Sequence, residues 1–556
     1  MAPHTQVNPG GFADTLGPMS DAPIFGFNHA KSGIVEDVVQ RVTTGVKDPL
    51  ITLNDAAYLE LKRLAHSHSA EALEWRSLSR ELGRMTDGEL RGKLADLARK
   101  YAWDVAGNFD PRVYKMVTRL GAPVLGGLMA PRATLKGLPH ALDMTALDGR
   151  VLVQGPRETI RRLAEKGTLV FTPTHLSNLD SVVFGFALER AGLPPATYGA
   201  GKNLFTNPVL SFFMHNLGAY RVDRRLRHTL YKDVLKTYSC VLIEQGYHSL
   251  FFPGGTRSRS GGVERKLKLG LAGTGIEAFT RTAVKGKPQK VFFVPATINY
   301  LLTLEAETLI DDYLAEEGKH RYIIEDDEST RVSRIASFMQ KLLGLDAACV
   351  IRFGQPLDCF GNAVDDEGTS HDARGRPIDM TSFIMGDGDK PGRDVAREVQ
   401  YTRELGDAIC ENFKKDTVLM ATHLVATVAF ESISRSSRHP SGKTDIFAML
   451  RQKDDVVVPR AQLAEDIDKL VARIKPMEDR GEIVLSAKVK GCSGEAILAD
   501  ALRAFAGYHT SEVIVPRGPD LVLADTRLLF YYQNRLAAHG LSKDLIAPKR
   551  TSRAAA

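Results

Sequence analysis

The feature that most constrains the fold of this chain is a change of texture between residues 150 and 300, where short apolar runs alternate with helical stretches. Three apolar runs have the length of a buried strand: TLVFTPTH (168–175), HSLFFPGG (248–255) and KVFFVPATI (290–298). Helical patterns lie between them: SVVFGFALERAG (181–192) and LAGTGIEAFTRTA (271–283). Strands that alternate with helices form a sheet covered by helices, so residues 146–360 are predicted to be an α/β domain. A further strand candidate, ACVIRFGQPL (348–357), is expected to complete the sheet.

Before this domain, the sequence predicts an irregular segment and then a helical region. Residues 1–50 are rich in glycine, proline and polar side chains, which predicts irregular structure. Residues 51–145 are predicted to be helical. Thr86 and Glu89 have the spacing of a capping box. Apolar side chains then recur on one helix face: Leu90, Leu94, Leu97 and Tyr101.

After the α/β domain the texture changes again. Residues 361–400 are polar and rich in glycine and aspartate, which predicts a long loop or insertion. Residues 401–545 are predicted to be mainly helical, with Pro459 near a helix start. An apolar stripe follows that proline: Leu463, Ile467, Leu470, Val471 and Ile474. Residues 546–556 are basic and rich in small side chains, which predicts a disordered tail.

The overall composition restricts the class of function. The 556 residues are 43% hydrophobic and 25% charged, which is ordinary for a soluble protein of two or three domains. The net charge of +6 is mild for this length. A nucleic-acid binder shows denser basic clustering, so no nucleic-acid partner is expected. The charge fits an anionic substrate or an anionic membrane surface better.

Cysteine usage and hydropathy indicate the compartment. The five cysteines form no C-x-x-C pair and suggest no metal site, so reduced thiols in the cytoplasm are expected. The first residues lack a basic start followed by an apolar core, so no secretory signal is expected. The most apolar stretches, 418–430 and 291–304, are shorter than the roughly 18 to 20 residues that span a bilayer. No transmembrane helix is therefore predicted, and peripheral membrane attachment stays open.

A candidate catalytic pair follows the first apolar run, in the stretch PTHLSNLDSV. If that run is a strand and a helix begins near Ser177 or Asn178, His175 lies at the carboxyl end of the strand, where open α/β sheets bind ligands. The first helical turn would bring Asp180 back towards the imidazole. A carboxylate bonded to one ring nitrogen leaves the other nitrogen as a general base. A purely structural interpretation also fits, because the helix dipole stabilises an aspartate in a first turn.

Two basic stretches and a proline follow downstream. GAYRVDRRLR (218–227) carries four arginines and one aspartate. A guanidinium group can donate two parallel hydrogen bonds to two oxygens of one phosphate. FFPGGTRSRSGG (251–262) passes from apolar residues into two glycines, hydroxyls and arginines, a combination that can cradle an anion. Neither a Walker A motif nor a G-x-G-x-x-G fingerprint is present in it, and a solvated basic turn is the alternative for both stretches. Pro295, within VFFVPATINY, is expected at a strand end or edge.

The order of these blocks resembles the four-block pattern of the glycerolipid acyltransferase superfamily, which contains glycerol-3-phosphate and 1-acylglycerol-3-phosphate acyltransferases. H-x4-D, G-x5-R, F-P-x-G-T-R-S and V-P follow one another in the family's order over residues 175–295. The stretch GAGKNLFTNPVLSFFMHNLGAYRVDRR (199–225) is similar to the segment that leads into the family's second block. The resemblance implies an acyltransferase α/β domain with a mixed sheet flanked by helices, between helical N-terminal and C-terminal regions.

The resemblance implies a role for each matching residue. His175 would be the general base and Asp180 would orient it. Arg224 and Arg257 would bind the phosphate of the acceptor. The other substrate-binding positions that it implies are Gly218, Gly255, Thr256, Ser258, Lys268 and Pro295. The tetrahedral oxyanion would be met by backbone N–H groups near Gly254 and Gly255, and no metal or cofactor is needed beyond the thioester co-substrate.

One position departs from the family's pattern. The third block usually has a glutamate where this chain has Gly254, and that glutamate helps to organise the acceptor site. The departure bears on which acceptor is used. Glu264 is a carboxylate close by in sequence that could compensate.

The length of the chain and its C-terminal extension resemble the glycerol-3-phosphate acyltransferase branch, as does the strand CVIRFGQPLDCFG (349–361). This branch implies transfer of a fatty acyl group from acyl-CoA or acyl carrier protein to the sn-1 hydroxyl of glycerol 3-phosphate. A peripheral protein at the cytoplasmic face of the membrane is expected. The stretch FFMHNLGAY (212–220) is an apolar candidate for the contact, although buried core is its commoner fate.

Two alternatives remain open at this point. The acceptor could be 1-acylglycerol 3-phosphate, another lysophospholipid or dihydroxyacetone phosphate. The chain could also be a lipid-binding homologue that has lost activity, an alternative suggested by Gly254 and opposed by the intact His175 and Asp180.

Overall fold

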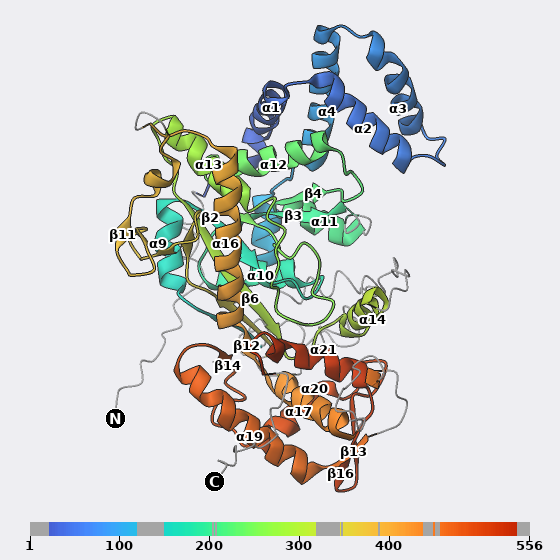
Figure 1. Ribbon diagram of the computed structural model, residues 1–556, viewed down its shortest axis with the longest axis vertical. Helices are drawn as coiled ribbons and strands as arrows, with labels where there is room; N and C mark the ends of the chain where they lie inside the picture. The colour runs from blue at the N-terminus through green and yellow to red at the C-terminus, as the bar shows by residue number, and fades with distance from the viewer. Residues whose placement is uncertain are drawn as a thin grey trace, which may run out of the picture.

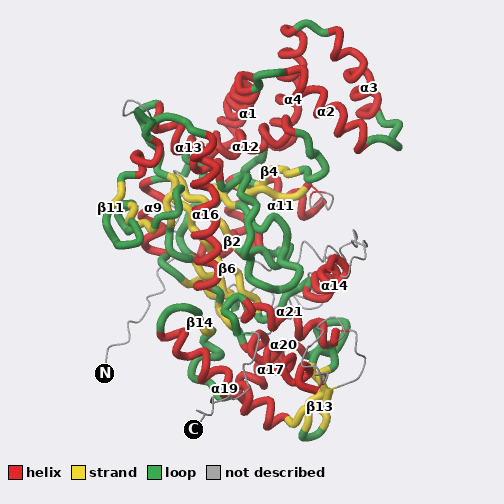
Figure 2. The backbone as a smooth tube through the Cα atoms, viewed as in Figure 1, coloured by secondary structure: helices red, strands yellow, loops and turns green. Residues whose placement is uncertain are grey.

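A mixed sheet lies at the centre of the molecule, with helices at both ends (Figures 1 and 2). The computed structural model describes residues 22–118, 150–202, 205, 208–317, 345, 348–386, 390–436, 449–450 and 456–541. The predicted tail at 546–556 and residues 119–145 of the predicted N-terminal helical region lie outside these residues. The α/β class with helical flanking regions is confirmed.

The sheet contains eleven strands within the described residues. They are β1 (Val151–Gln154), β2 (Thr168–Pro173), β3 (Thr197–Gly201), β4 (Ala219–Val222), β5 (Ser249–Leu250), β6 (Val291–Tyr300), β7 (Cys349–Phe353), β8 (Leu357–Asp358), β9 (Ala363–Val364), β10 (Ser370–His371) and β11 (Pro377–Ile378). The order is β11-β10-β9-β8-β6-β2-β5-β3-β4, with β7 paired to β6 and β1 paired to β7. Because β6, β2, β5, β3 and β4 are parallel, their carboxyl ends meet at one edge. Ligands of open α/β sheets bind at that edge.

Helices cover both faces of the sheet, and strand alternation explains which residue meets which helix. The helices around the sheet are α9 (Arg157–Lys166), α10 (Asp180–Arg190), α11 (Pro208–Asn216), α12 (Thr229–Glu244), α13 (Gly273–Val284), α14 (Ala306–Glu317) and α16 (Val395–Asp416). Leu169 and Phe171 of β2 pack in one core with α9 and α10. Val170, between them, faces the opposite core with α12, α13 and α16. This is the period of two expected when both faces of a strand are buried.

Pro295 lies inside a strand, so the prediction that it sits at a strand end or edge is wrong. It pairs with Thr172 of β2 in the middle of β6. The Pro295 carbonyl accepts a hydrogen bond from Gly354 N (2.8 Å). The backbone N and O of Pro295 therefore point away from β2, at the place on β6 between the residues that pair with β8 and those that pair with β7. A proline fits there because the N–H it lacks would not join the ladder to β2.

Two further expectations for the sheet need correction. The run at 248–255 forms only the two-residue strand β5, because the chain turns into a loop after Leu250. Residues 361–400 are not a plain loop: β9, β10 and β11 extend the sheet, and α16 already begins at Val395, after the cap Asp394. The sequence did not predict this extension of the sheet because its strands are only two residues long and are separated by polar turns.

The N-terminal helices are α1 (Phe27–Gly45), α2 (Pro49–Arg63), α3 (Ala70–Glu81) and α4 (Asp87–Val105), with 3-10 turns at Pro23–Gly26 and Leu82–Arg84. Residues 27–45 were predicted to be irregular and are a helix instead. Ile34, Val35, Val38 and Val42 form its buried stripe, which packs near α4 and α12. The predicted capping box of Thr86 and its apolar face are present in α4.

The C-terminal region packs beneath the sheet as a second core (Figure 1). Its helices are α17 (Ala421–Ser436), α19 (Arg460–Asp479), α20 (Gly494–Phe505) and α21 (Thr526–Ala537). Its strands are β12 (Val418–Leu419) paired with β14 (Val484–Leu485), and β13 (Val456–Pro459), β15 (Ile514–Arg517) and β16 (Asp520–Leu523) in a separate antiparallel sheet. The predicted stripe of α19 is buried except for Val471, which is partly buried.

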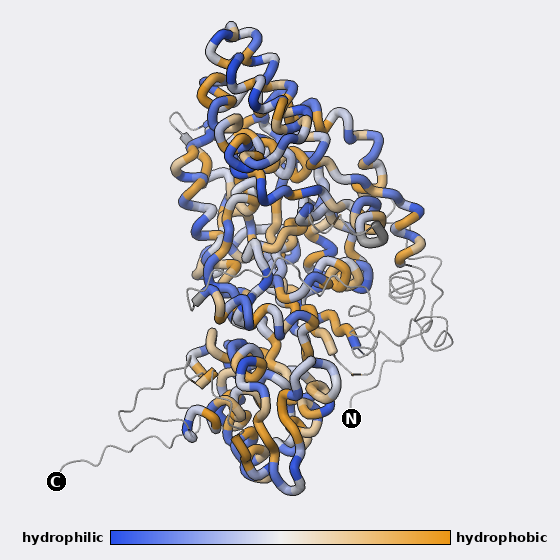
Figure 3. Tube along the Cα trace, turned by 90° about the vertical axis from the view of Figure 1, so that its right-hand side faces the viewer, coloured by the Kyte–Doolittle hydropathy of each residue, from blue (hydrophilic) through white to orange (hydrophobic). Residues whose placement is uncertain are grey.

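Hydrophobic and hydrophilic residues alternate along the helices at both ends of the molecule, as the side view shows (Figure 3). This alternation is typical of helices that bury one face. Among the described residues, no helix is long and apolar enough to cross a membrane.

Candidate active site

His175 and Asp180 meet at the carboxyl edge of the sheet. His175 lies in the loop after β2, and Asp180 is the first residue of α10. His175 Nδ1 is 2.8 Å from Asp180 Oδ2. An ionised carboxylate only accepts, so Nδ1 carries the proton and Nε2 is left as the acceptor. The His175 side chain is 16% exposed, while Asp180 is fully buried. The predicted contact is therefore present, although α10 begins at Asp180, two or three residues later than the predicted start at Asn178 or Ser177.

The imidazole is also held by an aromatic neighbour. The ring of Phe252 stacks on that of His175, with centroids 4.2 Å apart and an angle of 22° between the planes. Tyr300 at the end of β6 donates its hydroxyl to Asp180 Oδ1 (2.8 Å). These contacts fix the plane of the imidazole and the orientation of the carboxylate.

Four successive backbone N–H groups of the loop after β2 donate to buried carboxylates. Leu176 N and Ser177 N donate to Asp180 Oδ2, at 2.6 and 2.9 Å. His175 N donates to Glu264 Oε1 (2.8 Å) and Asn178 N donates to Glu305 Oε1 (2.9 Å). Burial raises the pKa of both Glu264 and Glu305, and the backbone donors and nearby arginines act in the opposite direction. The conformation of the His175 loop is thus set from three directions.

The loop after β5 lies directly against this first loop. Ser258 N donates to the carbonyl of His175 (2.7 Å), and the Ser258 hydroxyl donates to Gly262 O (2.7 Å). Gly255 has φ +73°, and a β-carbon there would collide with the Lys268 side chain. The glycine thus lets Lys268 pass close to the loop. Thr256 at the tip is exposed.

Gly255 does not offer its N–H to an oxyanion. That N–H donates to the carbonyl of Phe252 (3.0 Å) and closes the turn. Among the backbone N–H groups expected near Gly254 and Gly255 for an oxyanion, that of Gly255 is therefore engaged in the turn.

Two arginines lie at this edge of the sheet, Arg224 in the loop after β4 and Arg257 in the loop after β5. The pKa of Arg224 is lowered, first by desolvation and then by the positive charge of Arg257. Arg257 Nη1 is 3.2 Å from the buried carboxylate of Glu305. The ion pair keeps Arg257 in place, and the two arginines together make this edge of the sheet positive.

The structure does not bring Gly218 to this edge. Gly218 immediately precedes β4, at the amino edge of the sheet, whereas Arg224 follows the carboxyl end of the same strand. It has φ +90°, and its N–H donates to Asn108 O (2.9 Å). Its role is that of a turn. Pro295 is likewise buried within β6 and presents no side chain at the edge of the sheet.

Several functional candidates were missed by sequence reasoning: Phe252, Tyr300, Glu305 and Arg535. Phe252 and Tyr300 lie next to recognised blocks, so their position at strand ends was a usable signal. Glu305 and Arg535 lie outside the four sequence blocks, and no sequence signal pointed to them. Among the described residues, no group of three or more His, Cys, Asp or Glu side chains converges as metal ligands do.

Residues 150–299 match the model of the family named Acyltransferase. The segment that holds the His175–Asp180 pair and both arginine loops is therefore similar to acyltransferase domains. This agrees with the resemblance that the four blocks carry.

Relatives named glycerol-3-phosphate acyltransferase extend the match beyond that segment. The one from Pseudomonas fluorescens (strain Pf0-1) is 24% identical over 53% of this chain and 32% of its own length. The Xanthomonas campestris pv. campestris relative is 28% identical over 39% of this chain and 21% of its own length, and the one from Aeromonas hydrophila is 29% identical over 36% and 23%. The chain thus spans about a third or less of the length of these relatives.

A solved structure of a 1-acyl-sn-glycerophosphate acyltransferase from Thermotoga maritima is 14% identical and covers 54% of this chain and 93% of its own. The TM-score is 0.24, which carries no weight for the fold.

Proposed function

We propose that this protein transfers a fatty acyl group from an acyl thioester to the sn-1 hydroxyl of glycerol 3-phosphate, which gives lysophosphatidate for phospholipid synthesis. The observation that carries the proposal is the contact between His175 Nδ1 and Asp180 at the edge of the sheet where Arg224 and Arg257 also lie. The match to the acyltransferase family and the names of the relatives support the same reaction.

The chemistry follows from the tautomer of His175. Because Nδ1–H donates to Asp180, Nε2 accepts the proton of the attacking hydroxyl. The hydroxyl oxygen attacks the thioester carbonyl, the new C–O ester bond forms and the C–S bond breaks. The leaving thiolate takes the proton back from Nε2. The imidazolium that exists between these steps is stabilised by the Asp180 carboxylate.

The acceptor is selected by charge in this proposal. Arg224 and Arg257 bind the phosphate of glycerol 3-phosphate, and guanidinium groups suit phosphate geometry. The donor is acyl-CoA or acyl carrier protein, and the reaction calls for no metal and no other cofactor.

Peripheral contact with the cytoplasmic face of a membrane belongs to the same proposal, since the product partitions into lipid. We assign the contact to a basic aromatic patch that consists of Lys31, Trp103, Phe212, His215 and Arg221. Trp103 is 45% and Phe212 49% exposed. Lys31 Nζ lies 5.6 Å from the centroid of the Trp103 ring. The pKa of His215 is lowered, first by burial and then by the positive charges of Arg221 and Lys31.

The test is an acceptor panel with purified protein, a long-chain acyl-CoA and anionic lipid. Glycerol 3-phosphate is expected to be the best acceptor, ahead of glycerol, dihydroxyacetone phosphate and 1-acylglycerol 3-phosphate. Arg224→Gln should raise the KM for glycerol 3-phosphate about tenfold or more, because a hydrogen bond to a charged group contributes about 1.5–3 kcal/mol. Arg227→Gln, an exposed arginine three residues further on, is the matched control. Equal use of glycerol and glycerol 3-phosphate would contradict the proposal.

A further inference from the structure

Glu264 bonds the backbone of the catalytic histidine itself. Its Oε1 accepts the N–H of His175 (2.8 Å), while Asp180 and Glu305 hold the other three N–H groups of the loop. Glu264 lies in the coil between the loop after β5 and α13. The carboxylate is buried, so its contact with His175 N is made where solvent does not compete.

The carboxylate of Glu264 occupies the space in front of Gly254. A β-carbon placed on Gly254 would lie 3.2 Å from Glu264 Cγ and 3.3 Å from Glu264 Oε1. A side chain that grew from position 254 would therefore enter the same volume that the Glu264 carboxylate fills. Gly254 does not have a positive φ, so its backbone conformation is open to other residues. The Glu264 carboxylate fits in this place because Gly254 has no side chain.

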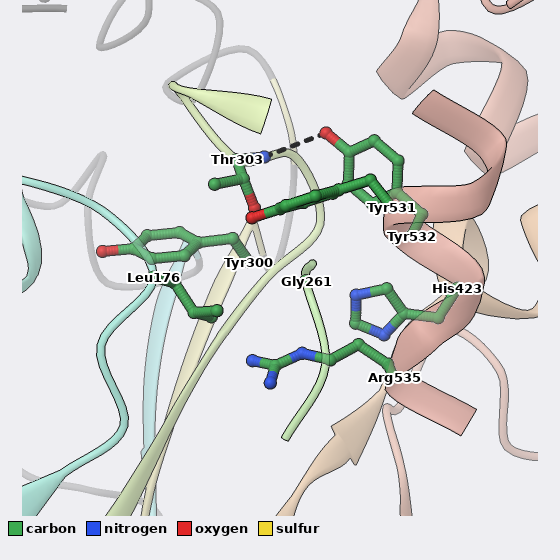
Figure 4. A pocket seen from close by; sticks show the side chains of 8 residues that line it. All are labelled: Leu176, Gly261, Tyr300, Thr303, His423, Tyr531, Tyr532 and Arg535. Carbon is green, nitrogen blue, oxygen red and sulfur yellow. Dashed lines mark hydrogen bonds between the residues drawn. The ribbon is translucent and has the colours of Figure 1, made fainter. Parts of the chain in front are cut away.

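A buried arginine from the C-terminal region balances this carboxylate. Arg535 of α21 is 3% exposed. Burial lowers the pKa of Arg535, and the negative charge of Glu264 is the largest effect in the opposite direction. Arg535 extends from α21 into a small cavity whose other side includes Leu176, Gly261 and Tyr300 (Figure 4). Its Nη2 donates to Ile298 O (3.1 Å) in β6. Burying a carboxylate is costly, and the positive charge of Arg535 lowers the pKa of Glu264 against the raising effect of burial.

The loop after β5 is joined to the same helix by further contacts. Asn534 Nδ2 donates to Ser260 O (2.8 Å), and Arg265 Nη2 donates to Ala537 O (2.9 Å). A β-carbon on Gly261 would collide with the backbone of Tyr531. The C-terminal helix α21 therefore lies directly against the segment that carries Gly254 and Glu264.

We propose that Glu264 is a positioning residue for His175, that it supplies from a coil downstream the carboxylate which position 254 lacks, and that α21 of the C-terminal region holds the segment which carries it. The inference rests on the proposed acyl transfer. It makes α21 part of the support of the active site. It also explains how the chain combines an intact His175–Asp180 pair with a glycine at position 254.

The test is a carboxylate exchange. Glu264→Ala should lower kcat about 10- to 100-fold, since a small misplacement of a reacting group costs rates of this order. The KM for glycerol 3-phosphate should change less than about threefold, because the arginines are untouched. Gly254→Glu combined with Glu264→Ala should recover most of the lost kcat, since a glutamate at 254 reaches the vacated volume. Gly254→Glu alone should impair the protein, because two carboxylates would compete for one site.

Further variants separate positioning from folding. Asp358→Asn removes a charge from another buried carboxylate that accepts two backbone N–H groups, at β8, and should leave kcat within about twofold. Arg535→Met should lower kcat in the wild-type background and change it little in the Glu264→Ala background, as coupled residues do. A double variant no more active than Glu264→Ala, at equal thermal stability, would overturn the proposal.

A second readout does not depend on turnover. The proton on His175 Nδ1, hydrogen-bonded to Asp180, should give a downfield NMR signal that disappears in His175→Gln. Glu264→Ala should shift or broaden this signal, and the exchange with Gly254→Glu should restore it. If wild type transfers no acyl group to any acceptor, the proposed function fails, while this signal still decides the role of Glu264. An unchanged signal in Glu264→Ala would refute the positioning role.

Discussion

Asp180 is the residue on which the local geometry depends most, because it accepts from His175 Nδ1, from two backbone N–H groups and from Tyr300. Asp180→Asn should lower kcat by about 10² to 10⁴, since an amide cannot hold the imidazole in the tautomer that leaves Nε2 as the base. Steady-state kinetics and a thermal melt measure the two consequences together. A loss of stability with unchanged kcat per folded molecule would contradict the assignment.

Buried histidines away from the site set a pH dependence of stability. His248 accepts from Leu169 N (3.0 Å), and burial lowers its pKa to about 4. Below about pH 6.5, His248 takes up a proton in the unfolded state, where its pKa is near 6.5, but stays neutral in the native state. The contribution of each such histidine to the free energy of unfolding is therefore fully present above about pH 6.5. It is lost by about 1.4 kcal/mol per pH unit as the pH falls towards 4.

Urea unfolding of wild type and His248→Gln between pH 7.5 and 4.5 measures this effect. The variant should be less stable at pH 7.5 but should show a shallower decline on acidification. His228 and His423, whose pKa values burial lowers to about 4 and about 3, continue to contribute in both proteins. Parallel declines in the two proteins would show that His248 is not held neutral.

At the residue scale, sequence reasoning succeeded where partners are close in the chain. His175 and Asp180 are five positions apart and follow a clear strand, so the turn between them could be foreseen. Glu305 and Arg535 reach the same site from distant elements, and no local pattern announces them. The sequence shows a glycine turn at Gly254 and Gly255, but it does not show the internal hydrogen bond that occupies the Gly255 N–H.

At the scale of elements, the approach of α21 to the loop after β5 depends on Gly261. Gly261 and Gly286 have nearly equal φ, +75° and +74°, but only Gly261 faces the backbone of Tyr531, whereas the space around Gly286 is open. Gly286→Ala should cost only the left-handed strain of about 1–2 kcal/mol. Gly261→Ala should cost more and should also reduce kcat, because the support of Glu264 would move. Equal unfolding midpoints for the two variants would contradict this packing.

Long elements were predictable and short ones were not. The strands β2 and β6 are continuous apolar runs, and α4 and α19 carry full stripes with start signals, so each was found. β9, β10 and β11 have two residues each, too few to show an alternation. α1 was missed because its valines and isoleucine follow a polar, glycine-containing start. Pro295 was misplaced because its neighbours across the sheet change partway along β6.

For the whole molecule, the basic aromatic patch predicts binding to anionic vesicles. Lys31→Gln should weaken sedimentation with vesicles of phosphatidylcholine and phosphatidylglycerol about fivefold at low salt, since a lysine near such a surface contributes about 1 kcal/mol. Phe212→Ser should weaken it about tenfold or more through lost burial of the ring. Tyr58→Ser, an exposed aromatic on α2, is the matched control. Equal losses for Phe212→Ser and Tyr58→Ser would place the contact elsewhere.

The central claim is that His175 is the base of an acyl transfer to glycerol 3-phosphate. The measurement that tests it most directly is the formation of lysophosphatidate from long-chain acyl-CoA and glycerol 3-phosphate, with wild type and His175→Ala side by side in the presence of lipid. The account predicts product with wild type and a loss of at least about 10²-fold with His175→Ala, the least that a positioned base contributes. Near-equal turnover of the two proteins would contradict it.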